Sequence, residues 1–227
     1  AALQENPFEQ LLEVGPGAGA LTRYLLELPD IRFKAVELDD EKVQYLPTQY
    51  PLIEGKIIHQ DFLTIDPPFE GSFTVIGNFP YNISSQILFK ITDWKEQVPV
   101  VIGMFQKEVA QRAAAPPGSK TYGVLSVLIQ AYYEVHYLFD VSPGCFNPPP
   151  KVMSGFIRLT RRKTDPAFKT ARQFNLLVKT AFNQRRKTLR NAVKSLFEPA
   201  FLTDPIFDKR AEMLSIDDFA RLTHLMR

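Results

Sequence analysis

The first half of the chain alternates short apolar runs with segments of helical spacing. Five apolar runs predict strands, at residues 11–14, 32–36, 56–59, 73–76 and 98–104. Four segments with helical spacing predict helices, at residues 21–28, 41–50, 84–94 and 107–114, the third capped by Ser84 or Ser85. Strands that alternate with helices build parallel sheets, so the pattern predicts an α/β fold.

The pattern changes in the second half of the chain. A helical segment at residues 124–131 is followed by strand patterns at residues 133–139 and 153–160, which are compatible with an antiparallel hairpin at one edge of the sheet. Three amphipathic patterns then predict helices, at residues 165–182, 185–197 and 216–225. We therefore expect two domains, a sheet domain over residues 1–162 and a small helical domain over residues 163–227.

Residues suited to ligand binding follow the first three strands. A glycine-rich loop, residues 15–19, follows the first strand and lets the backbone approach a ligand closely. Glu37 follows the second strand, where it can accept hydrogen bonds from ribose hydroxyls, and Asp61 follows the third, where it can bind an adenine amino group. Parallel strands end along one rim, so these groups predict a site for an adenosine. The glycine loop and the acid at Glu37 fit an NAD enzyme as well as another nucleoside-binding protein.

The fourth strand ends in the sequence Gly-Asn-Phe-Pro-Tyr, residues 77–81. The side-chain oxygen of Asn78 can accept a hydrogen bond, Pro80 stiffens the backbone, and Tyr81 offers a ring face. Together these groups suit a flat base that bears an exocyclic amine. An ordinary turn between a strand and a helix is the alternative, and the loop alone does not separate the two.

Composition excludes several classes of protein. Apolar residues make up 45% of the chain, but no run approaches the length of a membrane span, so we expect a soluble protein. The single cysteine, Cys145, excludes internal disulfides, fits a reducing compartment and, with three scattered histidines, leaves no structural zinc site. Residues 1–7 show no secretion signal, and we expect a cytoplasmic protein.

Positive charge is concentrated in one part of the chain. Residues 158–194 contain twelve lysines or arginines and one acid, Asp165, although the net charge of the whole chain is only +2. Such a distribution indicates a polyanionic partner. We predict that the densest cluster binds RNA, namely Arg185, Arg186, Lys187 and Arg190; a merely solvated basic face is the alternative.

Eight motifs occur together in a characteristic order and spacing, at residues 13–19, 36–39, 60–62, 77–81, 106–110, 122–126, 146–152 and 182–190. In this combination the chain resembles the ribosomal RNA adenine N6-dimethyltransferases, in particular their bacterial, KsgA-like housekeeping branch. The resemblance implies a Rossmann-like, class I S-adenosylmethionine-dependent methyltransferase sheet with a C-terminal helical domain. It also implies that S-adenosyl-L-methionine donates methyl groups to two adjacent adenosines in a hairpin loop near the 3′ end of small-subunit rRNA.

The resemblance further implies the roles of individual residues. The expected cofactor contacts are Glu13, Gly15, Pro16, Gly17, Glu37, Leu38, Asp61, Phe62 and Asn78, with Gly15 and its neighbours at the methionine part and Phe62 contributing its backbone. The expected catalytic residues are Asn78, Phe79, Pro80, Tyr81 and Phe146, the last placed against the target adenine. The implied partner is a small ribosomal subunit late in assembly, bound by a monomer without a metal ion.

The chain departs from the family pattern at two places. Phe79 stands where leucine is usual, which we expect to be tolerated because the backbone carbonyl does the bonding. A basic segment with a Gly-Gln-X-Phe motif, which closes over the cofactor in the family, has no counterpart here, so we expect this N-terminal segment to be missing and cofactor affinity to suffer.

Three other functions share parts of this pattern. The antibiotic-resistance branch, which dimethylates large-subunit rRNA, uses the same chemistry, but residues 146–151 and 182–190 favour the housekeeping branch. A non-catalytic RNA-binding assembly or transcription factor could use the same fold; the intact acids and the Asn78 loop argue against it. A nicotinamide oxidoreductase gives no role to Asn78 or Tyr81.

Overall fold

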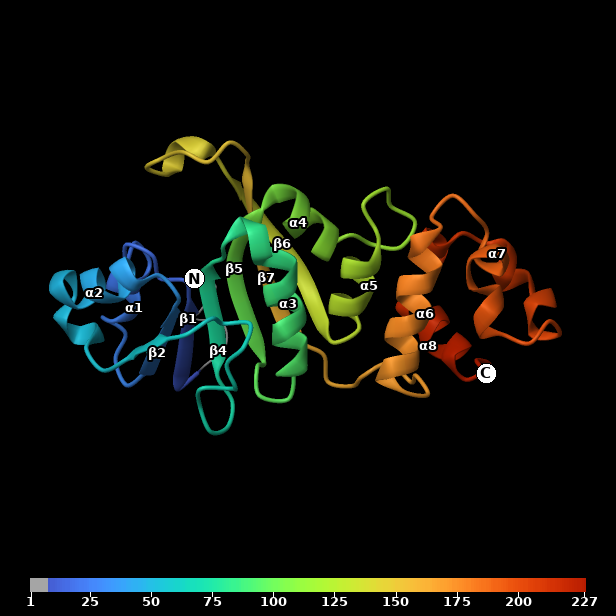
Figure 1. Ribbon diagram of the computed structural model, residues 1–227, viewed down its shortest axis with the longest axis horizontal. Coiled ribbons are helices and arrows are strands. Elements are labelled where there is room, and N and C mark those ends of the chain that lie inside the picture. The colour runs from blue at the N-terminus through green and yellow to red at the C-terminus, as the bar shows by residue number, and fades with distance from the viewer. Residues whose placement is uncertain (1–7) are drawn as a thin grey trace. The chain divides into compact units, whose positions relative to one another are not determined.

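The computed structural model describes residues 8–227 and contains one seven-stranded sheet (Figure 1). The strands lie in the order β3-β2-β1-β4-β5-β7-β6. Their bounds are β1 Gln10–Val14, β2 Arg32–Glu37, β3 Ile57–His59, β4 Thr74–Asn78, β5 Val100–Gln106, β6 Tyr133–Val141 and β7 Ser154–Arg161. Strands β1 to β5 pair in parallel, whereas β7 is antiparallel to β5. The predicted α/β sheet is confirmed, and β7 lies between β5 and β6.

The helices follow the predicted order, but several are shorter than predicted. Their bounds are α1 Thr22–Leu25, α2 Asp40–Gln49, α3 Ser84–Asp93, α4 Lys107–Ala113, α5 Val124–Gln130, α6 Ala171–Asn183, α7 Leu189–Val193 and α8 Ile216–Thr223. Helix α6 begins at residue 171 rather than 165 because the Thr170 side chain caps it, accepting a hydrogen bond from the Gln173 amide at 3.1 Å.

The predicted helix over residues 185–197 is wrong at its start. Helix α7 begins only at Leu189, and residues 184–187 form a turn in which the Lys187 amide donates to the Gln184 carbonyl at 2.8 Å. Three consecutive cations in a first helical turn would oppose the positive end of the helix dipole, whereas just beyond the end of α6 they are favourable.

The predicted serine cap of α3 is also wrong. Ile83 occupies the N-cap position and makes no side-chain cap hydrogen bond. The Ser84 hydroxyl instead donates to the carbonyls of Pro80 and Tyr81, at 3.0 and 3.2 Å. These bonds close a 3-10 turn, Tyr81–Ile83, which joins β4 to α3.

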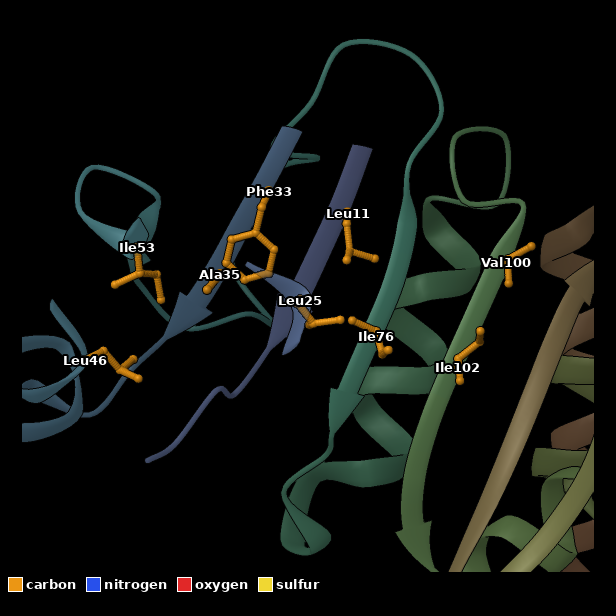
Figure 2. Packing of buried hydrophobic residues seen from close by; sticks show 9 residues of the cluster. All are labelled: Leu11, Leu25, Phe33, Ala35, Leu46, Ile53, Ile76, Val100 and Ile102. Carbon is orange, nitrogen blue, oxygen red and sulfur yellow. The ribbon is translucent and has the colours of Figure 1, made fainter. Parts of the chain in front are cut away.

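Buried side chains on the central strands form a core against α1 and α2. Figure 2 shows nine of them on β1, β2, β4, β5 and the flanking segments, and Leu25 of α1 points toward Ile76 of β4. Strand β5 is buried on both faces over nearly its whole length, as its continuous apolar sequence predicts. The core fixes the relative register of the strands whose ends carry the candidate site.

The chain divides into two compact units. Of the described residues, the first comprises residues 8–110 and 135–161, and the second comprises residues 111–134 and 162–227. This division and the expected one after residue 162 differ over residues 111–134. In the second unit, Phe174, Leu177, Val178 and Ala181 form the buried stripe of α6.

The described residues contain no helix that is long and apolar enough to cross a membrane. Within the same range, no cluster of three histidine, cysteine or acidic side chains could hold a metal ion. Residues 1–7, on which the expectation about secretion rests, lie outside the part of the chain that the structure describes.

Candidate active site

The carboxyl ends of β1, β2, β4 and β5 lie along one rim of the sheet, as the parallel register requires. Val14 of β1 lies opposite Val36 of β2, and Asn78 of β4 lies opposite Met104 of β5. The predicted glycine loop and the loop after β4 therefore emerge side by side. A Cβ atom on Gly15 would lie only 3.6 Å from the Pro80 ring, which shows how closely the two loops approach.

The glycine loop depends on backbone conformations that other residues rarely adopt. Gly15, Gly17 and Gly19 have φ values of +67°, +57° and +83°. The Gly15 amide donates to the Val36 carbonyl at 2.9 Å, which ties the loop to β2. Among residues 8–227, a Cβ atom on Gly17 would meet nothing within 4 Å, so within this part of the chain the loop borders space that a ligand can enter.

Glu37, at the end of β2, is held by three backbone amides. Its Oε1 accepts from the amides of Leu38 and Asp39 at 2.9 and 3.0 Å, and its Oε2 accepts from the Gly17 amide at 3.0 Å. A carboxylate offers about four lone-pair positions, so one on Oε2 is left for a hydroxyl donor. Leu38 is 63% exposed and provides apolar surface directly beside this carboxylate.

Glu13 lies beneath the glycine loop rather than on the open rim. The residue is 1% exposed, and its Oε2 accepts from the hydroxyl of Thr22, the first residue of α1, at 2.8 Å. Burial raises the pKa of Glu13 to about 7, against the opposing effect of the Thr22 hydrogen bond and with a further increase from Glu37. The predicted cofactor contact is thus a buried carboxyl group that joins β1 to α1.

Asp61, the third acid, and the next residue, Phe62, differ in the groups that they can offer to a ligand. Asp61 Oδ1 accepts from the Leu63 amide at 2.9 Å, so Oδ2 is left for an amino group. Phe62 is 4% exposed, and its ring packs edge-on against Trp94, with ring centroids 5.2 Å apart. The ring of Phe62 therefore belongs to the packed interior, and the role expected for its backbone stays a prediction.

Asn78 is the last residue of β4 and is exposed. Within residues 8–227 its side-chain amide makes no hydrogen bond. The next residue, Phe79, is 1% exposed and stacks on Phe105 at 4.6 Å between ring centroids. A Cβ atom on Gly103 would lie 2.1 Å from the Phe79 ring, so the larger side chain fits at this position because β5 carries a glycine beneath it.

Tyr81 is half-buried and is anchored by its hydroxyl group. The hydroxyl is hydrogen-bonded to that of Ser154, the first residue of β7, whose side chain is fully buried. The bond holds one end of the ring in place, and the residue as a whole stays partly accessible. Phe146, by contrast, is half-buried in the segment between β6 and β7, and within the described residues no ring contact joins it to the loop after β4.

The four predicted RNA-binding residues fall into two classes. The Arg185 side chain donates to the carbonyls of Lys120 and Tyr122 and lies 3.7 Å from a carboxylate oxygen of Glu212. Arg190 donates to the Leu202 carbonyl at 2.9 Å and pairs with Asp208 at 2.8 Å. Arg186 and Lys187 are exposed, and their side chains have no partner within the described range.

Sequence reasoning missed Thr22, Ser154 and Lys107. Thr22 and Ser154 are buried hydroxyls whose hydrogen bonds hold predicted site residues. Lys107 lies in the motif at residues 106–110, to which the sequence assigned no function, and it contacts Asp140 and Met153. The sequence offered one signal for these three residues: each is a polar residue at or near the start of a predicted strand or helix close to the rim.

Comparisons with known proteins indicate the family of the chain. The family model described as ribosomal RNA adenine dimethylase matches residues 1–227. Ribosomal RNA small subunit methyltransferase A of Cytophaga hutchinsonii is 50% identical, with 96% of this chain and 86% of that protein covered, and the protein of the same name in Phocaeicola vulgatus is 52% identical, with 94% and 78% covered.

Solved structures show the same fold. A dimethyladenosine transferase from Plasmodium falciparum superimposes with a TM-score of 0.78 and 25% identity, covering 96% of this chain and 91% of that one. The 23S rRNA methyltransferase ErmE superimposes with a TM-score of 0.70 at 24% identity, covering 97% and 92%. The sheet is therefore a Rossmann-like class I methyltransferase fold. The chain belongs to the ribosomal RNA adenine dimethylase family.

Proposed function

We propose that this protein transfers methyl groups from S-adenosylmethionine to N6 of two adjacent adenosines, in a hairpin loop near the 3′ end of small-subunit rRNA. The observation that carries the proposal is the exposed Asn78 side chain, which has no hydrogen-bond partner within residues 8–227, beside the glycine loop. Relatives that are about half identical over most of the chain are named small subunit methyltransferases, which supports this substrate.

The residues along the rim fit S-adenosylmethionine. Glu37 retains a lone pair for a ribose hydroxyl, and Asp61 retains Oδ2 for the adenine amino group. The exposed side chain of Leu38 provides an apolar wall for the flat base, and the open space at Gly17 admits the methionine part next to the backbone. We therefore assign cofactor binding to these residues, together with Gly15, Pro16 and the backbone of Phe62.

Bound S-adenosylmethionine supplies an electrophilic methyl group on its sulfonium. An exocyclic adenine amine is a poor nucleophile because its lone pair is delocalised into the ring. The Asn78 side-chain oxygen accepts from one N–H of the amine and a backbone carbonyl accepts from the other. These two bonds favour a pyramidal nitrogen whose lone pair points at the methyl group.

The structure favours the Phe79 carbonyl over that of Pro80 as the second acceptor. The Pro80 carbonyl already accepts from the Ser84 hydroxyl at 3.0 Å and the Ile83 amide at 3.3 Å. The Phe79 carbonyl accepts no hydrogen bond from any described residue.

Tyr81 stacks on the flipped base, a contact worth about 1–3 kcal/mol. No strong general base is needed, because the amine becomes acidic once it is methylated.

The phosphates of the RNA bind to lysine and arginine side chains that have no partner within the fold. Arg186 and Lys187 meet this requirement within the described residues, and we assign phosphate contacts to them first. The partner that we propose is a small ribosomal subunit late in assembly, met in the cytoplasm by a monomer of this protein.

Methyl transfer to isolated ribosomal subunits tests the proposal. Small and large subunits from cells that lack the modification are incubated with the protein and S-adenosylmethionine labelled with tritium in its methyl group. We expect incorporation into small subunits only. Incorporation into large subunits would indicate the resistance branch, and binding to RNA without incorporation into either subunit would indicate a non-catalytic assembly factor.

A further inference from the structure

The segment between β6 and β7, residues 142–153, is here called the connector; it carries Phe146. Figure 1 shows it in yellow, projecting from the end of the sheet at which α3 and α4 begin. The antiparallel register explains this position, since Ser154, the first residue of β7, pairs with Gln106, the last residue of β5. The connector therefore returns to the rim at which β4 ends with Asn78.

Lys107 is bonded to the last residue of the connector and to a residue of β6 shortly before the connector begins. It directly follows the last residue of β5, and its backbone amide donates to the carbonyl of Met153, the last connector residue, at 2.9 Å. Its Nζ donates to Oδ2 of Asp140 at 2.5 Å, and Asp140 lies two residues before the connector begins. One residue thus fixes the departure and the return of the segment.

Asp140 is held from a second side. The hydroxyl of Tyr137 donates to its Oδ1 at 2.5 Å. The hydrogen bonds from Lys107 and Tyr137 hold the pKa of Asp140 below its usual range. Tyr137 in turn packs over Gly155 of β7, where a Cβ atom would lie 2.5 Å from the tyrosine hydroxyl. The absence of a side chain at Gly155 thus lets Tyr137 approach β7 and reach Asp140.

The same rim carries a further bond to the connector. Tyr81, in the loop after β4, is hydrogen-bonded to Ser154, which follows the connector directly. The loop that we assign to the target base and the strand that ends the connector are thereby joined. One residue, Ser154, thus links Tyr81 to the end of the connector that Lys107 holds.

We infer that Lys107 is a positioning residue: through Asp140 and the Met153 carbonyl it holds the connector, and with it Phe146, at the methyl-transfer rim, and it is not a contact for RNA phosphate. The inference rests on the proposed function, because it takes the rim to be the place where the methyl group is transferred. The charge of Lys107 is paired within the fold at 2.5 Å, so it adds little attraction for a polyanion.

The only cysteine in the sequence provides a direct measurement. Cys145 is exposed and lies inside the connector, so a nitroxide spin label on its thiol reports connector motion without relying on catalysis. We expect Lys107→Met and Asp140→Asn each to sharpen the electron paramagnetic resonance spectrum. The double variant should be no more mobile than either single one, because both changes break the same pair. The exchanged pair Lys107→Asp with Asp140→Lys should recover part of the immobilised spectrum.

A matched control removes an equally short ion pair elsewhere. Glu96 lies 2.5 Å from Lys95 and is far from the connector in sequence, so Glu96→Gln should leave the label spectrum unchanged. In methyl transfer to small subunits, each single connector variant should lower kcat by about tenfold, since small misplacements of positioning groups have effects of this size or larger. The KM for the subunit and its salt dependence should stay as in the wild type.

Two results would overturn the inference. One is an unchanged label spectrum in both single variants. The other is a weaker, less salt-dependent RNA affinity in Lys107→Met together with a stronger affinity in Asp140→Asn, which is the behaviour of a phosphate contact. Failure of the proposed function would be seen separately, because the wild type would then methylate no small subunits. The spectra of the label would still show whether Lys107 holds the connector.

Discussion

The rim of the sheet and the turn between α6 and α7 were both predicted from short motifs, yet they differ in how many predicted contacts are open to a ligand. At the rim, Asn78 is exposed without a partner among residues 8–227, and Asp61 and Glu37 keep free acceptor positions. In the turn, Arg185 is already bonded to backbone carbonyls and lies near Glu212, and Arg190, in α7 just after the turn, is bonded to the Leu202 carbonyl and Asp208. The register of paired strands fixes the position of a residue at a strand end. Lysine and arginine side chains are long and flexible, so they can also bind partners inside the fold.

The most severe expected loss comes from the rim residue with the open amide. Asn78→Ala should lower methyl transfer by at least about 100- to 1,000-fold, because one preorganised acceptor is lost where charge develops. Affinity for S-adenosylmethionine should stay within a few-fold. Single-turnover methylation of small subunits and calorimetric cofactor titration measure the two effects.

The neighbouring Asn82 provides the control for this change. It is exposed and lies in the 3-10 turn after Pro80, so Asn82→Ala should keep near-full activity. Near-full activity in Asn78→Ala itself would contradict the role of the rim in methyl transfer. The contrast between the rim and the turn would then lose its basis.

Glu13, the buried acid beneath the glycine loop, should make stability depend on pH. The folded-state pKa of Glu13, about 7, lies above its ordinary value of 4.5, so its neutral form favours folding. Its contribution is complete below pH 4.5 and is lost as pH rises through about 7. Across that range the wild type should lose on the order of 3 kcal/mol relative to Glu13→Gln, which stays neutral and can still accept from Thr22.

Denaturant unfolding of the two proteins at a series of pH values gives this difference. Other titrating groups contribute equally to both and cancel. Parallel curves for wild type and variant would show that Glu13 is not the buried acid that we describe.

The fit of Phe79 over Gly103 can be broken and restored. Gly103→Ala places a Cβ atom 2.1 Å from the Phe79 ring and should reduce the free energy of unfolding by about 1–3 kcal/mol. Phe79→Leu in the same chain should recover much of this loss, because the smaller side chain vacates the space. Thermal unfolding of the two single variants and the double variant measures the coupling, and strictly additive losses would contradict the fit.

The smallest effects distinguish cations within the turn. Arg186→Gln and Lys187→Gln should each lower RNA affinity and reduce the slope of log affinity against log salt by about one. Arg185→Gln should leave that slope unchanged but lower thermal stability, because the carbonyls of Lys120 and Tyr122 lose their donor. A reduced slope in Arg185→Gln with unchanged stability would restore the simpler prediction that all adjacent cations bind RNA.

The succession of strands along the chain could be predicted because strands inside a parallel sheet are short apolar runs, whereas their order in the sheet was not predicted. The positions of the glycine loop, Glu37, Asp61 and Asn78 follow directly, since each of these stands at or just after a strand end. The ties between Glu13 and Thr22, between Tyr81 and Ser154, and between Lys107 and Asp140 could not be predicted. They join residues whose contact depends on how elements pack, and sequence spacing does not contain that information.

The start of α7 shows a further limit of pattern reading. The apolar spacing of residues 185–197 is helical, but three cations at its start favour a turn and the helix begins at Leu189. Periodicity alone gave the wrong boundary, and the charge of the first turn would have corrected it. The partners of Arg185 and Arg190, in contrast, become visible only in the folded chain.

The central claim is that the rim methylates N6 of two adjacent adenosines in small-subunit rRNA. Mass spectrometric mapping of that rRNA, after reaction of unmodified small subunits with the wild-type protein and S-adenosylmethionine, tests it most directly. The account predicts two neighbouring dimethyladenosines in one hairpin loop near the 3′ end, and none with Asn78→Ala. Methyl groups at other atoms or other nucleotides, or an unmodified loop with the wild type, would contradict it.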